Sequence, residues 1–391
     1  MSEKITLARE SAGLLERFVK MYPATPALVQ APGRVNLIGE HTDYNDGYVF
    51  PAAIAFQTRI GIAKRADRTV MVYSENYAEH VELKLDDLPS RARGHWSDYV
   101  VGVIRLLAAK LGTLTGADVL LSGDVPQGAG LSSSASLEVA VCTAFLEIAQ
   151  QRLDGTVVAQ LCQQAENEFV GARCGIMDQF ISVHGKKDHA LLLDCRTLGY
   201  QLLPIPPEVS LVICNTMVRH SHSASGYNQR RAECEAAVRF FSERLPGVKA
   251  LRDISLGDFE KLGKHLPEAI RRRARHVITE DARVLKAGEA LSASDVRRFG
   301  ELMKESHTSL RDDFEVSCQE VDVMVQLAEQ NPGVYGARMT GGGFGGCTIN
   351  LVESTLVERF KSNVLAGYEK ATGRVAEIYV SSAADGAGRL A

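Results

Sequence analysis

The stretch DVPQGAGLSSSASLEVA, residues 124–140, constrains the fold more than any other part of this 391-residue chain. An apolar segment over 116–126 predicts a strand, which leads into a glycine- and serine-rich loop and then directly into an apolar helix. The free N–H groups and the positive dipole end at the start of a helix attract anions. Gly128 and Gly130 let the backbone approach a ligand closely. The sequence therefore predicts a strand–loop–helix unit that binds phosphate.

The serines of this loop, and the lack of a lysine in it, limit the kind of phosphate loop it can be. Ser132, Ser133 and Ser134 could donate to phosphate oxygens or face a cation, whereas one serine would be enough to cap the helix. The common P-loop, G-x-x-x-x-G-K-[ST], needs a lysine where this helix starts. The GKK at Gly185 lacks the following serine or threonine. We therefore expect a phosphate loop of another type.

A dense polar cluster, GEHTDYNDG over 39–47, lies between two apolar segments that predict strands. A calcium loop of EF-hand type starting at Asp43 would need glycine and glutamate where Tyr48 and Ile54 stand. A zinc site would need more histidine or cysteine ligands than the single His41. Carboxylates, an amide and an imidazole this close together suit the several hydroxyls of a sugar. Taken alone, the cluster is either a sugar site or a solvated turn.

A second glycine-rich segment, TGGGFGGC over 340–347, contains the pattern G-x-G-x-x-G at Gly341, Gly343 and Gly346. The dinucleotide fingerprint needs a helix after this pattern, whereas the β-branched CTINLV that follows favours a strand. We therefore reject a Rossmann site. The segment is either a hairpin turn or a loop that packs against the phosphate loop or a substrate, and its density of glycine favours the second.

Several single residues have both a structural and a functional interpretation. Asp178 stands among apolar residues in CGIMDQF, where an acid is costly unless it is paired or functional, so a structural ion pair and a catalytic base are both consistent. Glu166 resembles any acid on a helix surface, and Trp96 is either a core residue or an aromatic wall for a planar base. His220 and His222 could ligate a metal, but solvated loop histidines are favoured.

Composition and charge exclude several classes of protein. The chain is 45% hydrophobic and 24% charged, with a net charge of −4, so it lacks the basic footprint of a nucleic-acid-binding protein. Its first 23 residues predict an amphipathic helix rather than a signal peptide. Charges interrupt the longest apolar stretches, which are too short to span a membrane. Eight scattered cysteines without a C-x-x-C pair are expected to stay reduced.

Blocks of predicted strands alternate with blocks of predicted helices. Helices are expected over 96–112, 137–150, 156–175, 230–245, 258–291 and 295–314. The sequence over 334–352 predicts two strands around the glycine turn, and VAEIYVSS predicts a last strand. This mixture favours the α+β class, with a domain boundary between 175 and 207.

Together these segments resemble the galactokinases, which belong to the GHMP superfamily of small-molecule kinases, over nearly the whole chain. GRVNLIGEHTDYNDGYVFP (33–51) is similar to the galactokinase signature, and VPQGAGLSSSASLEVA (125–140) to the phosphate loop of the superfamily. MTGGGFGGC (339–347) is similar to its third glycine motif. CGIMDQ (174–179) and the Y-x-x-RR after Ser225 also fit. The first motif is specific to galactokinases because it carries the sugar contacts.

The resemblance implies an activity, ligands and a fold. The enzyme would transfer the γ-phosphoryl group of ATP to O1 of α-D-galactose, the committing phosphorylation of galactose catabolism, and would use Mg²⁺. The fold would be GHMP-kinase-like, an α+β chain of the two-domain sandwich type. An N-terminal half (1–185) of ribosomal-protein type would bind ATP and sugar beside a helix-rich α+β C-terminal half (186–391), with the active site between them. The last strands could return to the N-terminal half. We expect a cytoplasmic monomer without nucleic-acid or membrane partners.

The resemblance also assigns roles to single residues. Asp178 would be the base near the anomeric hydroxyl, with Arg34 as its partner. Trp96 and Tyr99 would flank the adenine. The metal ion would be held by Ser134 and Glu166. The sugar would be bound by Glu40, His41, Thr42, Asp43, Gly175 and Tyr227. The ATP phosphates would be bound by Gly128, Ala129, Gly130, Leu131, Ser132, Ser133 and Ser134.

Two departures from the family pattern lie beside the predicted sugar site. Gly226 stands where relatives often carry glutamate, and His222 replaces a common apolar residue. One rival function is a kinase for another sugar, such as N-acetylgalactosamine, arabinose or galacturonate, but the unaltered EHTDYNDG favours galactose. Another is a non-catalytic sensor of galactose and ATP. A sensor would be expected to lose its phosphate loop or its base, whereas Ser134, Ala135 and Asp178 are all present.

Overall fold

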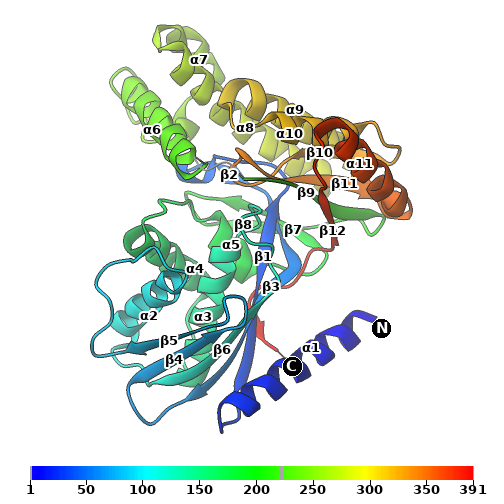
Figure 1. The fold of residues 1–391 in the computed structure, drawn as a ribbon. Coiled ribbons are helices and arrows are strands. Elements are labelled where there is room, and N and C mark those ends of the chain that lie inside the picture. Colours follow the sequence, from blue (N-terminus) through cyan, green and yellow to red (C-terminus); the bar gives the residue numbers. More distant parts are fainter. Residues whose placement is uncertain (1, 220–222, 391) are drawn as a thin grey trace.

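The computed structural model describes residues 2–219 and 223–390, which form two lobes, one above the other in Figure 1. The lower lobe is built on a six-stranded sheet. Its strands follow the order β13 (Gly388–Arg389), β1 (Ala27–Asn36), β3 (Pro51–Lys64), β6 (Ala117–Gly123), β4 (Thr69–Ser74) and β5 (Glu79–Lys84). Neighbouring strands are antiparallel except β4 and β6, which are parallel.

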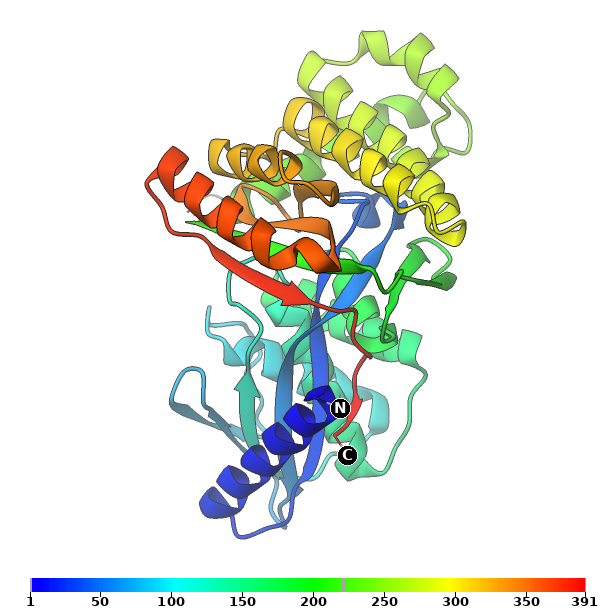
Figure 2. The same cartoon turned by 90° about the vertical axis from the view of Figure 1, so that its right-hand side faces the viewer.

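Helices cover both faces of this sheet. One face carries α2 (Ser97–Leu111), α3 (Ser133–Ala149), α4 (Gly155–Gln164) and α5 (Met177–His184), with α3 packed against β1 and β3. The other face carries α1 (Ser2–Met21), as Figures 1 and 2 show. Helix α3 is apolar on most sides because it lies between the sheet and α2, α4 and α5.

Helix α1 confirms the amphipathic pattern of the N-terminal sequence. Leu14 and Phe18 are fully buried, and Phe18 packs over Gly61 of β3, which has no side chain to obstruct the ring. Leu15 and Val19, which lie about 100° around the helix from Leu14 and Phe18, are 39% and 51% exposed. The helix therefore covers the sheet with a narrow apolar stripe.

The upper lobe combines a four-stranded antiparallel sheet with helices. The sheet has the order β10 (Val334–Met339), β11 (Gly345–Glu353), β9 (Val209–Arg219) and β12 (Glu377–Ser381). The helices are α6 (Ser223–Ser242), α7 (Leu256–Leu262), α8 (Glu268–Ser292), α9 (Val296–Ser309), α10 (Gln319–Glu329) and α11 (Val357–Thr372). A small third sheet joins β2 (Tyr48–Val49), β7 (His189–Asp194) and β8 (Tyr200–Pro204).

The two lobes share a hydrophobic core, and the C-terminal segment of the chain contributes a strand to the sheet of each lobe. Val35 and Leu37 of the lower lobe and Phe299 and Met303 of α9 belong to one buried cluster. The chain also returns from β12 in the upper lobe to β13, which pairs with β1 in the lower one. The two lobes are therefore joined by packed side chains as well as by strand pairing.

The structure confirms the predicted strand pair around the second glycine segment, since β10 and β11 are antiparallel neighbours. The helix expected over 156–175 is shorter and changes form: α4 passes into a π-helical turn over Ala165–Val170 and ends at Gly171. Such turns widen a helix locally and occur often at functional sites. Here the turn carries Glu166, which is buried rather than exposed as a surface acid would be.

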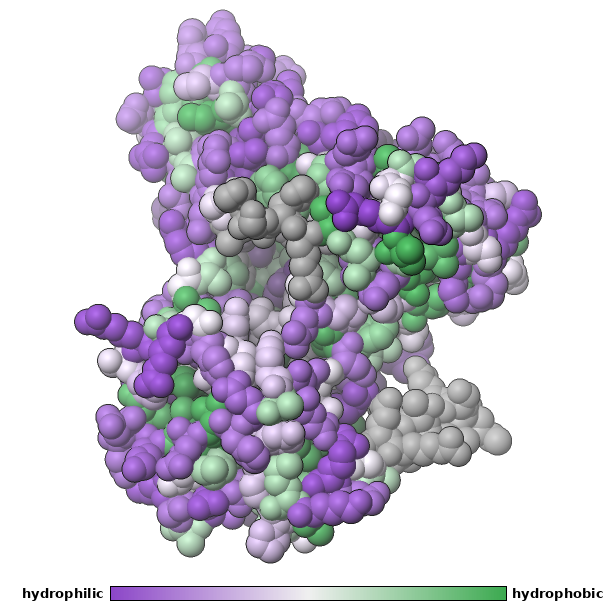
Figure 3. Space-filling model, in the orientation of Figure 1, coloured by the Kyte–Doolittle hydropathy of each residue, from purple (hydrophilic) through white to green (hydrophobic). Residues whose placement is uncertain are grey.

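The surface of the molecule is mostly polar. Figure 3 shows hydrophilic side chains over most of one face, with apolar residues in scattered groups. Over the ranges described, no helix combines the length and the apolar character that crossing a bilayer requires.

Candidate active site

The loop over 128–134, called here the nucleotide loop, connects β6 to the start of α3 as the sequence predicts. Gly128, Gly130 and Ser132 have left-handed backbone angles, with φ of 65°, 78° and 60°. The side chains of Ala129 and Leu131 are buried in the core between the lobes. No described side chain caps α3, so the first N–H groups of the helix can serve an anion.

A cavity of 710 Å³ opens beside the nucleotide loop. Gly128, Ser133 and Ser134 line one part of it, and Trp96 and Tyr99 from the start of α2 line another. Predicted phosphate-binding and adenine-flanking residues thus share one cavity, whose size suits a small-molecule ligand.

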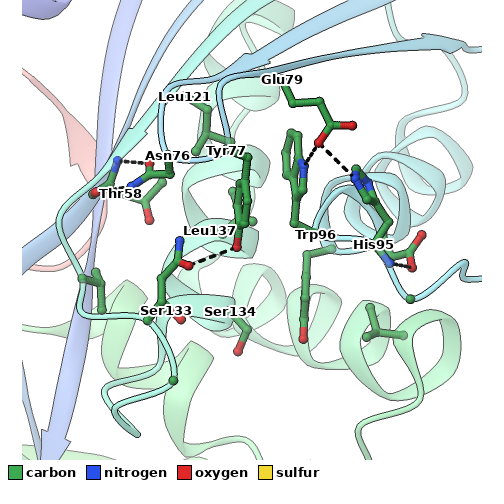
Figure 4. A pocket seen from close by; sticks show the side chains of 18 of the residues that line it. Thr58, Asn76, Tyr77, Glu79, His95, Trp96, Leu121, Ser133, Ser134 and Leu137 are labelled. Carbon is green, nitrogen blue, oxygen red and sulfur yellow. Dashed lines mark hydrogen bonds and ion pairs between the residues drawn. The ribbon is translucent and has the colours of Figure 1, made fainter. Parts of the chain in front are cut away.

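A second aromatic residue, which the sequence did not single out, stands beside Trp96. Tyr77 stacks on Trp96 with ring centroids 5.3 Å apart and planes 5° apart. The indole N–H of Trp96 donates to Glu79 over 2.8 Å, and His95 contacts the same carboxylate (Figure 4). Tyr77 is 47% exposed, so the aromatic wall is open to solvent.

Arg34 of β1 and Asp178 of α5 form a two-pronged ion pair next to the nucleotide loop. Nε and Nη2 of Arg34 each donate to one carboxylate oxygen over 2.8 Å, and Nη1 donates to the Gly130 carbonyl over 2.6 Å. The Ser132 hydroxyl donates to Oδ2 of Asp178. The Arg34 side chain is 6% exposed and that of Asp178 is 25% exposed. The acid is therefore held firmly while part of it remains accessible.

The polar cluster over 39–47, called here the signature loop, is closed by its own side chains. Thr42 is fully buried, and its hydroxyl oxygen lies 2.8 Å from the Gly39 carbonyl and 2.6 Å from the Tyr48 carbonyl. The Asn45 amide donates to the His41 carbonyl over 2.9 Å. These bonds keep His41 in a left-handed conformation, with φ of 67°.

Glu40 connects the signature loop to the upper lobe. Its carboxylate accepts from Arg338 over 2.6 Å, from the Asn36 amide over 2.7 Å and from the Gly341 backbone N–H over 2.8 Å. Burial raises the pKa of Glu40, and the Arg338 guanidinium opposes that shift. The side chain is 2% exposed. In this arrangement Glu40 fixes the signature loop to Arg338 and Gly341 of the upper lobe.

Asp43 of the signature loop lines a cavity together with Gly175, and it lies near enough to Asp178 to be influenced by its charge. Burial, and then the charge of Asp178, raise the pKa of Asp43 to about 6. A Cβ atom added to Gly175 would lie 1.9 Å from Oδ2 of Asp43. Only glycine at position 175 leaves room for the carboxylate, which explains the glycine of the CGIMDQ motif.

Aromatic rings from three segments of the chain pack together at the signature loop. The His41 ring lies 5.7 Å from that of Tyr227 and 4.6 Å from that of Phe314. Burial raises the pKa of Tyr227, and the charge of Asp43 raises it further. Nδ1 of His41 bonds the Tyr44 hydroxyl over 3.0 Å, whereas its buried Nε2 has no partner among the described residues.

Two buried acids lie beyond the Ser134 end of the nucleotide loop. Glu166 bonds the Ser134 hydroxyl, and burial raises the pKa of Glu166. Burial and the charge of Glu166 raise the pKa of Glu138 well above its usual range. Among the described residues, no arginine or lysine pairs with either acid. The pair of acids would therefore be stabilised by a cation.

The glycine segment over 341–346, called here the glycine hairpin, touches both halves of the site. A Cβ on Gly341 would lie 2.9 Å from the Gly130 carbonyl oxygen, and the Gly341 N–H already donates to Glu40. The hairpin thus packs against the nucleotide loop, as the density of glycine predicts. Gly226 leaves room for the ring of Phe344, since a Cβ there would lie 2.7 Å from it.

The sequence did not single out several residues that complete the site. Glu138 lies within the phosphate-loop motif and Gln179 within CGIMDQ. Their closeness in sequence to Ser134 and Asp178 could have marked them as candidate site residues. No pattern in the sequence marks Tyr77 or Arg338 as a site residue. Tyr77 lies in the polar turn after β4, and Arg338 lies within β10. His220 and His222 lie outside the described residues.

Three protein-family models match the chain. They are the galactokinase galactose-binding signature over residues 16–64, the GHMP kinases N terminal domain over 98–186, and the GHMP kinases C terminal model over 288–370. A curated galactokinase of Roseiflexus sp. (strain RS-1) is 48% identical over 382 residues, which cover 97% of each chain.

Solved structures give the same result. The Lactococcus lactis galactokinase complexed with galactose matches with a TM-score of 0.93 and 37% identity, over 97% of this chain and 99% of that one. The Methanococcus jannaschii mevalonate kinase matches with a TM-score of 0.65 and 18% identity, over 93% of this chain and 100% of that one. At this lower identity the likeness extends to the fold alone.

Proposed function

The chain belongs to the galactokinase family, and we propose that the space between its lobes is where O1 of α-D-galactose receives the γ-phosphoryl group of ATP. The protein is an ATP-dependent sugar kinase with the GHMP-kinase fold, so the α+β class and the activity implied by the resemblance are confirmed. The roles of single residues are the proposal, and each is supported below by contacts.

The sugar occupies the space bounded by Asp43, His41, Tyr227 and Asp178. The buried, unpartnered Nε2 of His41 supports this, because a buried polar atom needs a hydrogen-bond partner and a sugar hydroxyl supplies one. The room that Gly175 leaves for Asp43 supports it as well. The direct sugar contacts expected for Glu40 and Thr42 stay predictions, since both side chains bond within the protein here.

The Arg34–Asp178 pair is the observation that carries the proposed reaction. Asp178 is accessible and near the sugar space, and Ser132 and Arg34 bind it to the nucleotide loop. Asp178 orients the O1 hydroxyl and receives its proton as O1 bonds to the γ-phosphorus and the bond to ADP breaks. Arg34 keeps the carboxylate in place throughout. The N–H groups of the nucleotide loop hold the phosphates, and Trp96, Tyr99 and Tyr77 hold the adenine.

The residues present fit a magnesium ion. Ser134 and Glu166 would hold it, since an acid without a basic partner and a hydroxyl lie together next to the phosphate loop. In the described part of the chain, no three His, Cys, Asp or Glu side chains are arranged to hold a metal alone. This agrees with an ion that shares its ligands with ATP phosphates. When bound, it would neutralise charge on the phosphates.

A cytoplasmic, monomeric enzyme remains part of the proposal. The rival function as a sensor of galactose and ATP has no support in the site, because the Arg34–Asp178 pair and the nucleotide loop are intact.

The test is ADP release over a panel of sugars, with binding measured by calorimetry in parallel. We expect ADP release with galactose that depends on Mg²⁺, and much slower release with N-acetylgalactosamine, arabinose and galacturonate. Galactose binding without ADP release would favour the sensor. Faster release with one of the other sugars would change the substrate but not the reaction.

A further inference from the structure

A buried amide joins two acids next to the proposed metal site. Nε2 of Gln179 lies 2.6 Å from Oε2 of Glu166 and 3.0 Å from Oε2 of Glu138. Gln179 and Glu138 are fully buried, and Glu166 is 6% exposed. The three side chains come from α5, α3 and the π-helical turn after α4. One amide group therefore connects three separate elements of the lower lobe.

The contacts of Gln179 also decide which oxygen of Glu166 is occupied. The Cys174 thiol donates to Oε2 over 3.3 Å, so two donors hold the same oxygen. The other oxygen, Oε1, is then the better ligand for a cation. A carboxylate that could rotate would offer its oxygens in turn, and its position toward Ser134 would be less defined.

The orientation of the Gln179 amide follows from its neighbours. Oε2 of Glu166 and Oε2 of Glu138 both act as acceptors, so the two hydrogens of the Gln179 NH₂ group point at them. If either acceptor were lost, the amide could turn over and present its oxygen instead.

We propose that Gln179 is a positioning residue that fixes Glu166 for the metal ion accompanying ATP, and that Glu138 anchors the Gln179 amide. The inference rests on the proposed function and adds to it residues that touch neither sugar nor nucleotide. Partners of metal ligands commonly matter about as much as the ligands, and their loss weakens metal binding by about 10- to 100-fold.

The experiment measures Mn²⁺ binding by electron paramagnetic resonance, in the presence of a non-hydrolysable ATP analogue. We expect Gln179→Leu and Glu138→Leu to weaken Mn²⁺ binding by about 10- to 100-fold, and Glu138→Gln, which keeps an acceptor oxygen, to stay within about twofold of wild type. Gln164→Leu is the matched control, because Gln164 donates to Glu168 at the exposed surface. Galactose affinity without metal should be unchanged in all four variants.

Two results would overturn the inference. The first is Mn²⁺ binding by Gln179→Leu at wild-type strength. The second is equal weakening by Glu138→Gln and Glu138→Leu, since charge rather than anchoring would then matter. If Gln179→Leu fails to fold, the Glu138 pair carries the same test. Wild-type enzyme that does not phosphorylate galactose would refute the proposed function instead, so the two failures are distinguishable.

Discussion

The two halves of the active site are built in opposite ways. The signature loop is buried and closed by its own hydrogen bonds, and Glu40 ties it to the upper lobe through Arg338 and Gly341. The nucleotide side is an open cavity of 710 Å³ whose aromatic wall, Tyr77 on Trp96, reaches solvent. One half has its shape before any ligand arrives, and the other keeps exposed surface for a ligand to cover.

This difference follows from what each ligand needs. A sugar is distinguished by the angles of its hydroxyls, so the groups that bind it gain from being held in advance. A nucleotide brings charge and a large flat ring, so loop N–H groups, a cation and stacking provide most of its binding. Substitutions on the sugar side should therefore cost more than those on the nucleotide side.

The largest effect is expected for Asp178→Asn, at the point where the two halves meet. The amide cannot receive the O1 proton, so kcat should fall by about 10²- to 10⁴-fold, while the ATP analogue binds almost normally. ADP release and calorimetry measure the two quantities. Asp86→Asn is the matched control because Asp86 pairs with Arg68 at the surface. Near-normal turnover by Asp178→Asn would contradict the assignment as base.

The next largest effect is expected for Gly175→Ala on the sugar side. The added methyl would lie 1.9 Å from Oδ2 of Asp43 and push the carboxylate away. Loss of a charge-assisted bond of about 1.5–3 kcal/mol should raise the KM for galactose by about 10- to 100-fold, with the KM for ATP almost unchanged. Gly388→Ala, where a Cβ meets nothing within 4 Å, is the control. If Gly175→Ala changed the KM for galactose and the KM for ATP by the same factor, the idea that the sugar side is shaped before ligands bind would be contradicted.

A smaller effect is expected for Tyr77→Ala on the nucleotide side. An aromatic pair contributes about 0.5–1.5 kcal/mol, so the KM for ATP should rise by about twofold to tenfold and the KM for galactose should not change. Tyr77→Phe keeps the stacked ring and should behave as wild type. The proposed difference between the halves would be reversed if Tyr77→Ala raised the KM for ATP by a larger factor than Gly175→Ala raises the KM for galactose.

Asp281→Asn should leave turnover unchanged and alter only the pH dependence of stability. Asp281 of α8 accepts the Tyr48 N–H beside the signature loop, and burial raises its pKa to about 7 from 3.8. Between about pH 4 and pH 7 the Asp281 carboxyl is protonated in the folded state and ionised in the unfolded state. Its contribution to the stability of the wild type therefore falls as the pH rises from about 4 to about 7. An asparagine keeps an acceptor and does not titrate.

The comparison for Asp281→Asn uses urea unfolding at pH 5 and pH 8. We expect the variant to lose less stability than wild type between the two values, and to be the more stable protein at pH 8. Kinetics at pH 8 should show the same kcat and KM. Equal losses of stability in both proteins would mean that Asp281 is ionised in the folded state.

Information along the chain is enough to predict the separate local units of this protein. The phosphate loop, the strand pair around the glycine hairpin and helix α1 follow from glycine placement and from apolar periodicity, which act over a few neighbouring residues. The signature loop could be recognised as a candidate sugar site because its polar groups are contiguous. These parts needed no knowledge of how the lobes pack.

The contacts among the charged groups of these units depend on how distant segments of the chain pack together. Arg338 reaches Glu40 and Gln179 bridges Glu138 and Glu166 because the lobes and helices pack in one particular way. A buried carboxylate is stable only with a partner, and that partner can come from any element that packing brings close. Spacing along the chain carries no record of such contacts. The family resemblance pairs Asp178 with Arg34 in advance, whereas the contacts of Glu40 with Arg338 and of Glu166 with Gln179 come from the structure alone.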